Sequence, residues 1–85
     1  MKPIQIVGHA RFEMQRRNAT EAEVEAVVRN PQQILPAKKG RQVFQSKVGS
    51  KGHLLLRVIV KEKASAYVVV SAYKTSKVAK YWRQT

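Results

Sequence analysis

Hydrophobic residues recur at two different spacings along the chain, and the spacing changes near residue 40. Val24, Val27 and Val28 follow the i, i+3, i+4 spacing of a helix that packs one face on a core. After residue 40 the apolar residues instead alternate with polar ones or form short valine-rich runs, which is typical of strands. Helices followed by strands predict an α+β domain.

The helix that contains these valines has well-marked ends. Thr20 and Glu23 have the spacing of a capping box, in which each side chain binds the other residue's backbone amide. Asn30 and Pro31 end the helix, because the residue before a proline disfavours helical geometry. Capping and the helix dipole account for the acidic residues of the first turns, so we do not interpret them as catalytic carboxylates.

A shorter helix is predicted before it, from about residue 9 to residue 17. Ala10, Phe12 and Met14 are expected to face the core. Arg17 lies at the end of this helix, where a cation suits the dipole. Residues 4–7 precede the helix and are expected to form a short edge strand.

Three strands are predicted in the second half of the chain, over residues 41–48, 53–61 and 66–74. Short turns join them, so we expect an antiparallel meander. Residues 76–82 fit either a short helix or an edge strand. The elements together predict one domain over residues 1–85, in which two N-terminal helices pack on a three- to four-stranded antiparallel sheet.

The strand pattern also predicts what each face of the sheet carries. If the most aliphatic side of each strand packs on the helices, Arg57, Ser71 and Tyr73 lie together on the opposite face. Two residues of the preceding strand are expected beside them: Gln45 and Lys47. The core-facing residues of the last strand would then be Ala66, Val68, Val70 and Ala72.

The net charge of the chain predicts what kind of partner it binds. The chain has 17 Lys and Arg against 5 acidic residues, a net charge of +12, and Glu62 is the one acid after residue 26. Such dense positive charge favours binding to a polyanion, so nucleic acid is the expected partner. An anionic membrane surface, an acidic protein and a solvated surface without a partner are the alternatives.

Composition excludes several kinds of site. The chain has no cysteine and no aspartate, so thiolate sites and carboxylate magnesium sites are not expected, and no cofactor is predicted. No apolar stretch has the length of a membrane span, and the start lacks the apolar core of a signal peptide. We expect a cytoplasmic protein without a membrane partner.

The residues around Arg57 suit a phosphate group. A guanidinium can hold a phosphate through two hydrogen bonds, the hydroxyls of Ser71 and Tyr73 add neutral donors, and tyrosine rings can stack on unpaired bases. The alternative is that Arg57 only extends from a half-buried face beside ordinary strand tyrosines. His9 is a candidate general acid or base, or a residue at a helix start without chemistry.

Short motifs in a particular order suggest a family. They are His9-Ala10, Met14, Arg17, Asn30-Pro31, Gly40-Arg41, Leu56-Arg57-Val58, Val70-Ser71-Ala72-Tyr73, Lys77 and Lys80-Tyr81. Over residues 8–82 the chain resembles small bacterial domains related to the BrnT-type and RelE-type toxins, in the group that includes barnase and the colicin ribonucleases. The resemblance implies a RelE-like fold and a metal-independent endoribonuclease that an acidic antitoxin neutralises.

The resemblance and the predicted sheet face together indicate which residues form the catalytic and nucleic-acid-binding site. The catalytic candidates are His9, Arg57, Ser71 and Lys77. The nucleic-acid-binding candidates are Arg17, Lys47, Tyr73, Lys74, Lys80 and Tyr81. The chain has Ser71 where the family usually has threonine, and Asn18-Ala19 where it usually has glycine and isoleucine. The predicted function is a toxin-like endoribonuclease acting on RNA, and the alternatives are a non-catalytic nucleic-acid-binding module and a protein-interaction domain. The sequence also allows a homodimer.

Overall fold

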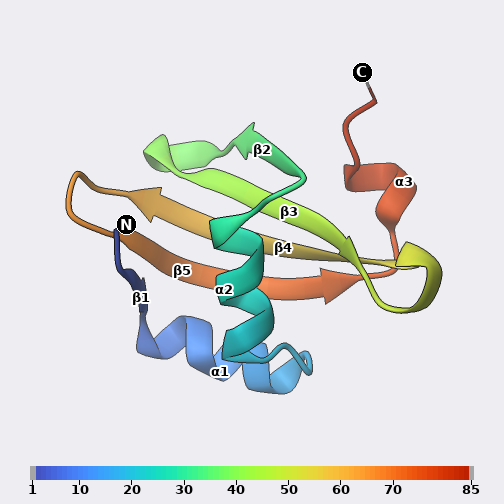
Figure 1. The fold of residues 1–85 in the computed structure, drawn as a ribbon, viewed down its shortest axis with the longest axis horizontal. Coiled ribbons are helices and arrows are strands. Elements are labelled where there is room, and N and C mark those ends of the chain that lie inside the picture. The colour runs from blue at the N-terminus through green and yellow to red at the C-terminus, as the bar shows by residue number, and fades with distance from the viewer. Residues whose placement is uncertain (1, 85) are drawn as a thin grey trace.

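Two main helices cover one face of a five-stranded sheet in the computed structural model, which describes residues 2–84 (Figure 1). The helices are α1 (Gly8–Arg16), α2 (Glu21–Arg29) and the short α3 (Val78–Tyr81). The strands are β1 (Ile4–Ile6), β2 (Gln33–Pro36), β3 (Gln42–Val48), β4 (Leu54–Glu62) and β5 (Tyr67–Thr75). The α+β class is therefore confirmed. Within residues 2–84, no helix has the length and apolar character that a membrane span requires.

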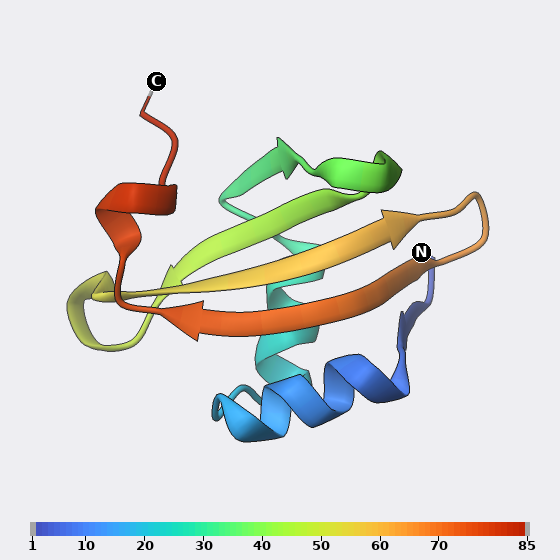
Figure 2. The same ribbon diagram turned by 180° about the vertical axis from the view of Figure 1, so that it is seen from behind.

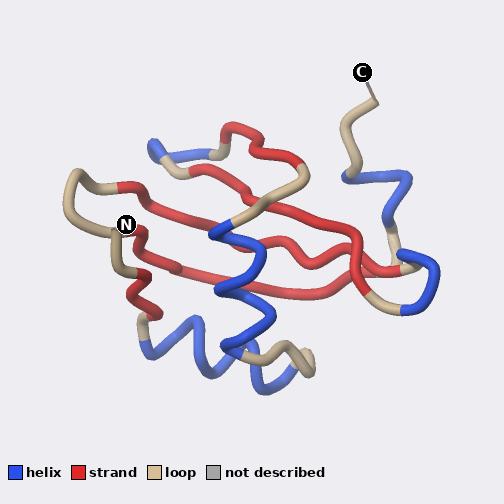
Figure 3. Tube along the Cα trace, in the orientation of Figure 1, coloured by secondary structure: helices blue, strands red, loops and turns tan. Residues whose placement is uncertain are grey.

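The sheet has one more strand than predicted, and it is mixed. Its order is β1-β5-β4-β3-β2, with β1 at one edge and β2 at the other (Figure 3). Strands β2 to β5 are antiparallel, whereas β1 pairs with β5 in parallel. The sequence predicts no strand over residues 33–36, which include Pro36. A proline is nevertheless tolerated in the outermost strand, where its missing N–H breaks no ladder.

The capped helix α2 agrees with its prediction. The first helix, α1, differs from its prediction in the burial of one residue. Thr20 and Glu23 form the capping box, and the three valines of α2 are buried. In α1, Ala10 and Met14 are buried, whereas Phe12 is 58% exposed. With 3.6 residues in each turn, Ala10 and Met14 share one side of the helix and Phe12 lies on the other. The prediction that Phe12 faces the core was wrong.

A β-bulge in β5 decides which of its residues face the helices. Ile59 pairs with Ser71 and Val60 pairs with Val69, so Val70 is an extra residue in β5. The bulge moves the alternation by one position, which buries Val69 completely and leaves Val70 half-buried. The predicted core set of this strand was therefore wrong for Val68 and Val70. Ala66 and Ala72 are buried as predicted.

The two faces of the sheet have different surroundings. We call the side covered by α1 and α2 the helix face, and its buried sheet residues are Phe44, Leu56, Val58, Val60, Val69 and Ala72. We call the other side the open face, which Figure 2 shows from the front, with α2 behind the sheet and α1 below its edge. Arg57 and Tyr73 lie on the open face, because they alternate with core residues and are paired with each other. This placement agrees with the prediction.

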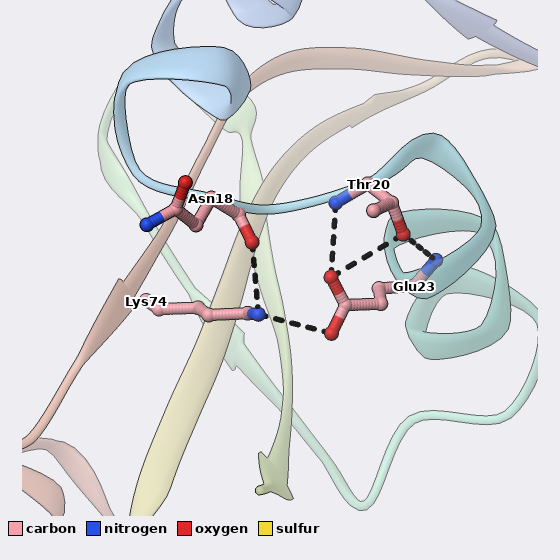
Figure 4. Close-up of polar contacts among 4 residues, drawn as sticks. All are labelled: Asn18, Thr20, Glu23 and Lys74. Carbon is pink, nitrogen blue, oxygen red and sulfur yellow. Dashed lines mark hydrogen bonds and ion pairs between the residues drawn. The ribbon is translucent and has the colours of Figure 1, made fainter.

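A lysine of β5 ties the helix face to the start of α2 (Figure 4). The Lys74 ammonium donates to the Asn18 carbonyl at 3.0 Å and lies 3.0 Å from a Glu23 carboxylate oxygen. The other oxygen of Glu23 accepts the Thr20 backbone N–H at 2.9 Å. The hydrogen bond from the Thr20 amide lowers the pKa of Glu23 below its ordinary value of 4.5, and the hydrogen bond from Lys74 lowers it further.

We predict that this carboxylate makes part of the stability depend on pH. A carboxyl group with a lower pKa in the folded protein stabilises the fold above its unfolded pKa, and this contribution is lost as the pH falls through the folded pKa. Glu23→Gln should therefore lower the free energy of unfolding near pH 7, by less than about 1 kcal/mol because the pair is partly exposed. Urea unfolding should show this difference shrinking below about pH 4.

Glu25→Gln is the matched control, since Glu25 lies on the same helix and is exposed. It should change stability less than Glu23→Gln at neutral pH. Equal losses in the two variants would show that the network around Lys74 contributes nothing beyond helix charge.

Candidate functional site

Four polar side chains line up across the open face, one from each antiparallel strand. The strand register places Gln33 opposite Gln45, Gln45 opposite Arg57, and Arg57 opposite Tyr73. Residues directly opposite each other point to the same face, so these four form a continuous line that we call the polar row. The neighbouring line of paired residues belongs to the helix face and is apolar: Ile34, Phe44, Val58 and Ala72.

Hydrogen bonds connect every member of the polar row. Arg57 donates from Nε to the Gln45 Oε1 at 2.9 Å and from Nη1 to the Tyr73 hydroxyl at 2.6 Å. Gln45 in turn donates from Nε2 to Gln33 Oε1 at 2.8 Å. A guanidinium has donors and no acceptor, so Gln45 must turn its oxygen towards Arg57 and its amino group towards Gln33. Arg57 therefore fixes the orientation of both amides.

Tyr73 lies at the other end of this chain of bonds. Its oxygen accepts a hydrogen bond from Arg57, so the tyrosine's own O–H can donate to another group. Arg57 uses two of its five N–H groups in the row, which leaves three for other acceptors. The pair thus combines a fixed positive charge with a neutral donor, a combination that suits a phosphate oxygen.

The C-terminal segment (residues 78–84) lies on the open face and is held by the polar row. Gln45, which is 0% exposed, also donates to the carbonyl of Tyr81 at 3.2 Å. Gln33 accepts the Arg83 backbone N–H at 3.1 Å and donates to the Arg83 carbonyl at 2.7 Å. No residue of α3 is buried, and these polar bonds help to hold the segment on the sheet.

Two aromatic rings of this segment rest on cations of the sheet. The Arg57 guanidinium carbon is 4.1 Å from the centre of the Tyr81 ring. The Lys47 ammonium is 4.3 Å from the centre of the Trp82 ring. Both distances are within the range of cation–π attraction. The segment therefore brings two rings to the charged part of the open face.

Several predicted site residues lie together here. Arg57, Tyr73 and Tyr81 are in contact, Lys47 lies against Trp82, and Lys80 lies 5.2 Å from the Tyr81 ring. Ser71 is on the same strand two residues before Tyr73, and Lys77 is the N-cap residue of α3. The structure tests the positions of these residues and not their roles, so the roles remain predictions.

Three predicted site residues lie elsewhere. His9 and Arg17 are exposed at the two ends of α1, which packs on the helix face. Lys74 points to the helix face, where it binds Glu23 and Asn18 (Figure 4). A general acid or base must come within hydrogen-bond reach of the reacting group. The fold does not bring His9 to Arg57, because α1 packs on the helix face and Arg57 lies on the open face.

Sequence reasoning missed two residues of this surface. The sequence predicts no strand at Gln33, so its place in the row could not be predicted. Trp82 lies in the segment whose structure the sequence left open between a helix and a strand. Its signal was a lone tryptophan between Lys80 and Arg83, in a part of the chain with no apolar periodicity.

The acidic residues lie away from the open face. The five glutamates lie on α1, on α2 and at the end of β4. The ion pairs among residues 2–84 join Glu13 to Arg16, Glu21 to Arg11, Glu23 to Lys74, and Glu62 to Lys2. Within the same residues, Lys47, Arg57, Lys77, Lys80 and Arg83 form no ion pair. The open face and the C-terminal segment thus carry positive charge that the protein does not neutralise.

Comparison with known proteins gives a family. No curated protein and no solved structure matches the chain. A family model described as a domain of unknown function (DUF4258) matches residues 6–74, from β1 into β5, and its description names no activity. The chain therefore belongs to the DUF4258 family of domains.

Proposed function

We propose that this protein binds RNA through its open face. The observation that carries the proposal is the distribution of charge. Four of the five glutamates lie on α1 and α2, and the fifth pairs with Lys2 at the end of β4, whereas the cations around the polar row have no acidic partner among the described residues. Unneutralised cations gathered on one surface attract a phosphate backbone and release its counterions on binding.

The polar row supplies a contact of defined geometry within this charged surface. Arg57 is held by Gln45 and Tyr73, so its position is set before a ligand arrives. A guanidinium fixed in this way binds a phosphate at a smaller entropic cost than a free lysine does. The resemblance to the BrnT-type and RelE-type toxins favours RNA over DNA as the polyanion.

We predict a salt dependence that belongs to this face. Lys77→Gln combined with Lys80→Gln removes two exposed cations beside the polar row. If both contact phosphates, the slope of log K against log salt for single-stranded RNA should become shallower by about 0.7 for each cation. Fluorescence anisotropy with a labelled RNA at several salt concentrations measures this slope.

The matched control removes the same charge from the helix side. Arg16→Gln combined with Arg17→Gln alters two exposed cations at the end of α1. This variant should keep the wild-type slope. If the two double variants change the slope equally, RNA binding follows net charge and has no preferred face.

A second candidate function is metal-independent cleavage of RNA, as the toxin resemblance implies. One observation favours it: the Arg57 Nη1 lies 2.6 Å from the Tyr73 hydroxyl. In this mechanism the RNA 2′-hydroxyl loses its proton to water as it attacks the adjacent phosphorus, and Arg57 stabilises the negative charge that develops. Tyr73 donates its proton to the leaving 5′-oxygen and regains one from water, so the products are a 2′,3′-cyclic phosphate and a 5′-hydroxyl. Ser71 would orient the phosphate, and an acidic antitoxin would cover the same face.

This candidate predicts which residues cleavage needs. Wild-type protein in EDTA should convert single-stranded RNA to products that end in a 2′,3′-cyclic phosphate. Tyr73→Phe should slow cleavage by about 100-fold or more, because the proton donor is lost. Arg57→Lys should slow it too, because an ammonium lacks the fixed fork of a guanidinium.

His9→Ala is the informative control for cleavage, since His9 lies on the helix side. It should cleave RNA at the wild-type rate if the reaction takes place on the open face. Loss of activity in His9→Ala, with normal activity in Tyr73→Phe, would move the reaction to α1. Binding without any cleavage by the wild type would leave RNA binding as the function.

A further inference from the structure

Trp82 is the single tryptophan of the chain, and it is not part of the hydrophobic core. Tryptophan has the largest apolar side chain, and burying it contributes strongly to stability. Here it instead lies half-buried in the C-terminal segment, which contributes no buried residue. Its placement on the open face therefore calls for an explanation other than core packing.

The backbone on both sides of Trp82 is fixed by the polar row. The carbonyl of Tyr81 accepts from Gln45 at 3.2 Å. Both backbone polar groups of Arg83 bind the side chain of Gln33, at 2.7 and 3.1 Å. These bonds restrain the residues before and after Trp82. The backbone that carries the Trp82 ring is thus restrained by hydrogen bonds to the sheet, although α3 itself has only one turn.

The ring itself rests on a charge. The Lys47 ammonium is 4.3 Å from its centre, and the neighbouring Tyr81 ring lies over Arg57 in the same manner. A cation covers one side of an aromatic ring, and the partial exposure of Trp82 leaves ring surface available to a ligand. A restrained ring loses little conformational freedom when a flat group stacks on it.

We propose that Trp82 is a stacking platform for an unpaired base, and that it makes the open face selective for single-stranded RNA over duplex RNA. This inference rests on the proposed RNA binding and specifies its substrate. Lys47 lies against the ring, and Lys80 and Arg83 are close to Trp82 in the chain, so these cations supply charge for the adjoining phosphates. Bases inside a duplex stack on each other, so they offer no free face to the ring.

The test compares two RNAs of equal length with three forms of the protein. The RNAs are an oligouridylate of about twelve nucleotides and a duplex of about twelve base pairs, which are long enough to span one such surface. Trp82→Ala should weaken binding of the oligouridylate by about 5- to 150-fold, the range that base–aromatic stacking gives. Binding of the duplex should change by less than about twofold, and Trp82→Phe should retain most of the affinity for the oligouridylate.

Phe12→Ala is the matched control. Phe12 is another exposed ring beside a cation, since Arg16 lies 5.7 Å from its centre, but it is on α1. This variant should bind both RNAs as the wild type does. An equal loss in Phe12→Ala and Trp82→Ala would overturn the assignment.

Tryptophan fluorescence separates stacking from a merely structural role. Because Trp82 is the single tryptophan, its emission reports directly on this position. Oligouridylate should quench the emission, whereas inorganic polyphosphate, which has no bases, should bind without comparable quenching. This measurement needs no variant, so it stands even if Trp82→Ala fails to fold.

Three further results would contradict the inference, and they differ in what they imply. Unchanged oligouridylate affinity in folded Trp82→Ala would leave RNA binding intact and remove the stacking role. Tighter binding of both RNAs by this variant would show that the segment covers the site instead of completing it. No binding of either RNA by the wild type would overturn the proposed function together with the inference.

Discussion

The guanidinium of Arg57 sets the direction of every hydrogen bond in the polar row. Because it can only donate, Gln45 must offer it an oxygen, and the amino group of Gln45 then points to Gln33 and to the carbonyl of Tyr81. Gln33 can therefore pair with the backbone of Arg83 in one orientation. Leaving the buried Gln45 oxygen without a donor would cost about 1–3 kcal/mol, so the row and the C-terminal segment both depend on Arg57.

The sheet separates two tasks that one small domain has to combine. On the helix face, the aliphatic residues of β4 and β5 pack under α1 and α2, and Glu23 and Lys74 join β5 to the start of α2. On the open face, polar side chains satisfy one another and cations stay without acidic partners among the described residues. A net charge of +12 repels itself in a folded chain of this size, and a bound polyanion would relieve that repulsion.

Local signals in the sequence were enough to predict several elements. The Thr20 capping box and the valine spacing of α2 depend on residues at most a few positions apart, and both agree with the structure. The placement of Arg57 and Tyr73 on one face also followed from alternation alone. In these features the spacing of residues along the chain is enough to determine the local structure.

The remaining features depend on contacts between distant residues. The bulge at Val70 arises from pairing with β4, and strand propensity cannot place an extra residue within a run of valines. Strand β2 includes a proline and is stabilised by pairing with β3, so its pattern resembles a loop. The position of Trp82 depends on Gln33, about fifty residues earlier in the chain. The part of the candidate site around Arg57 could be predicted from the sequence. The contacts between the C-terminal segment and the sheet could not.

The most direct test of the central claim is to map RNA contacts by NMR. Amide chemical shifts of the ¹⁵N-labelled protein would be followed during titration with a short single-stranded RNA. The account predicts that the largest changes fall on β3, β4 and β5 around the polar row and on residues 78–84, with α1 and α2 nearly unchanged. Changes concentrated on α1 and α2 would contradict it, because RNA would then bind the side that carries the glutamates.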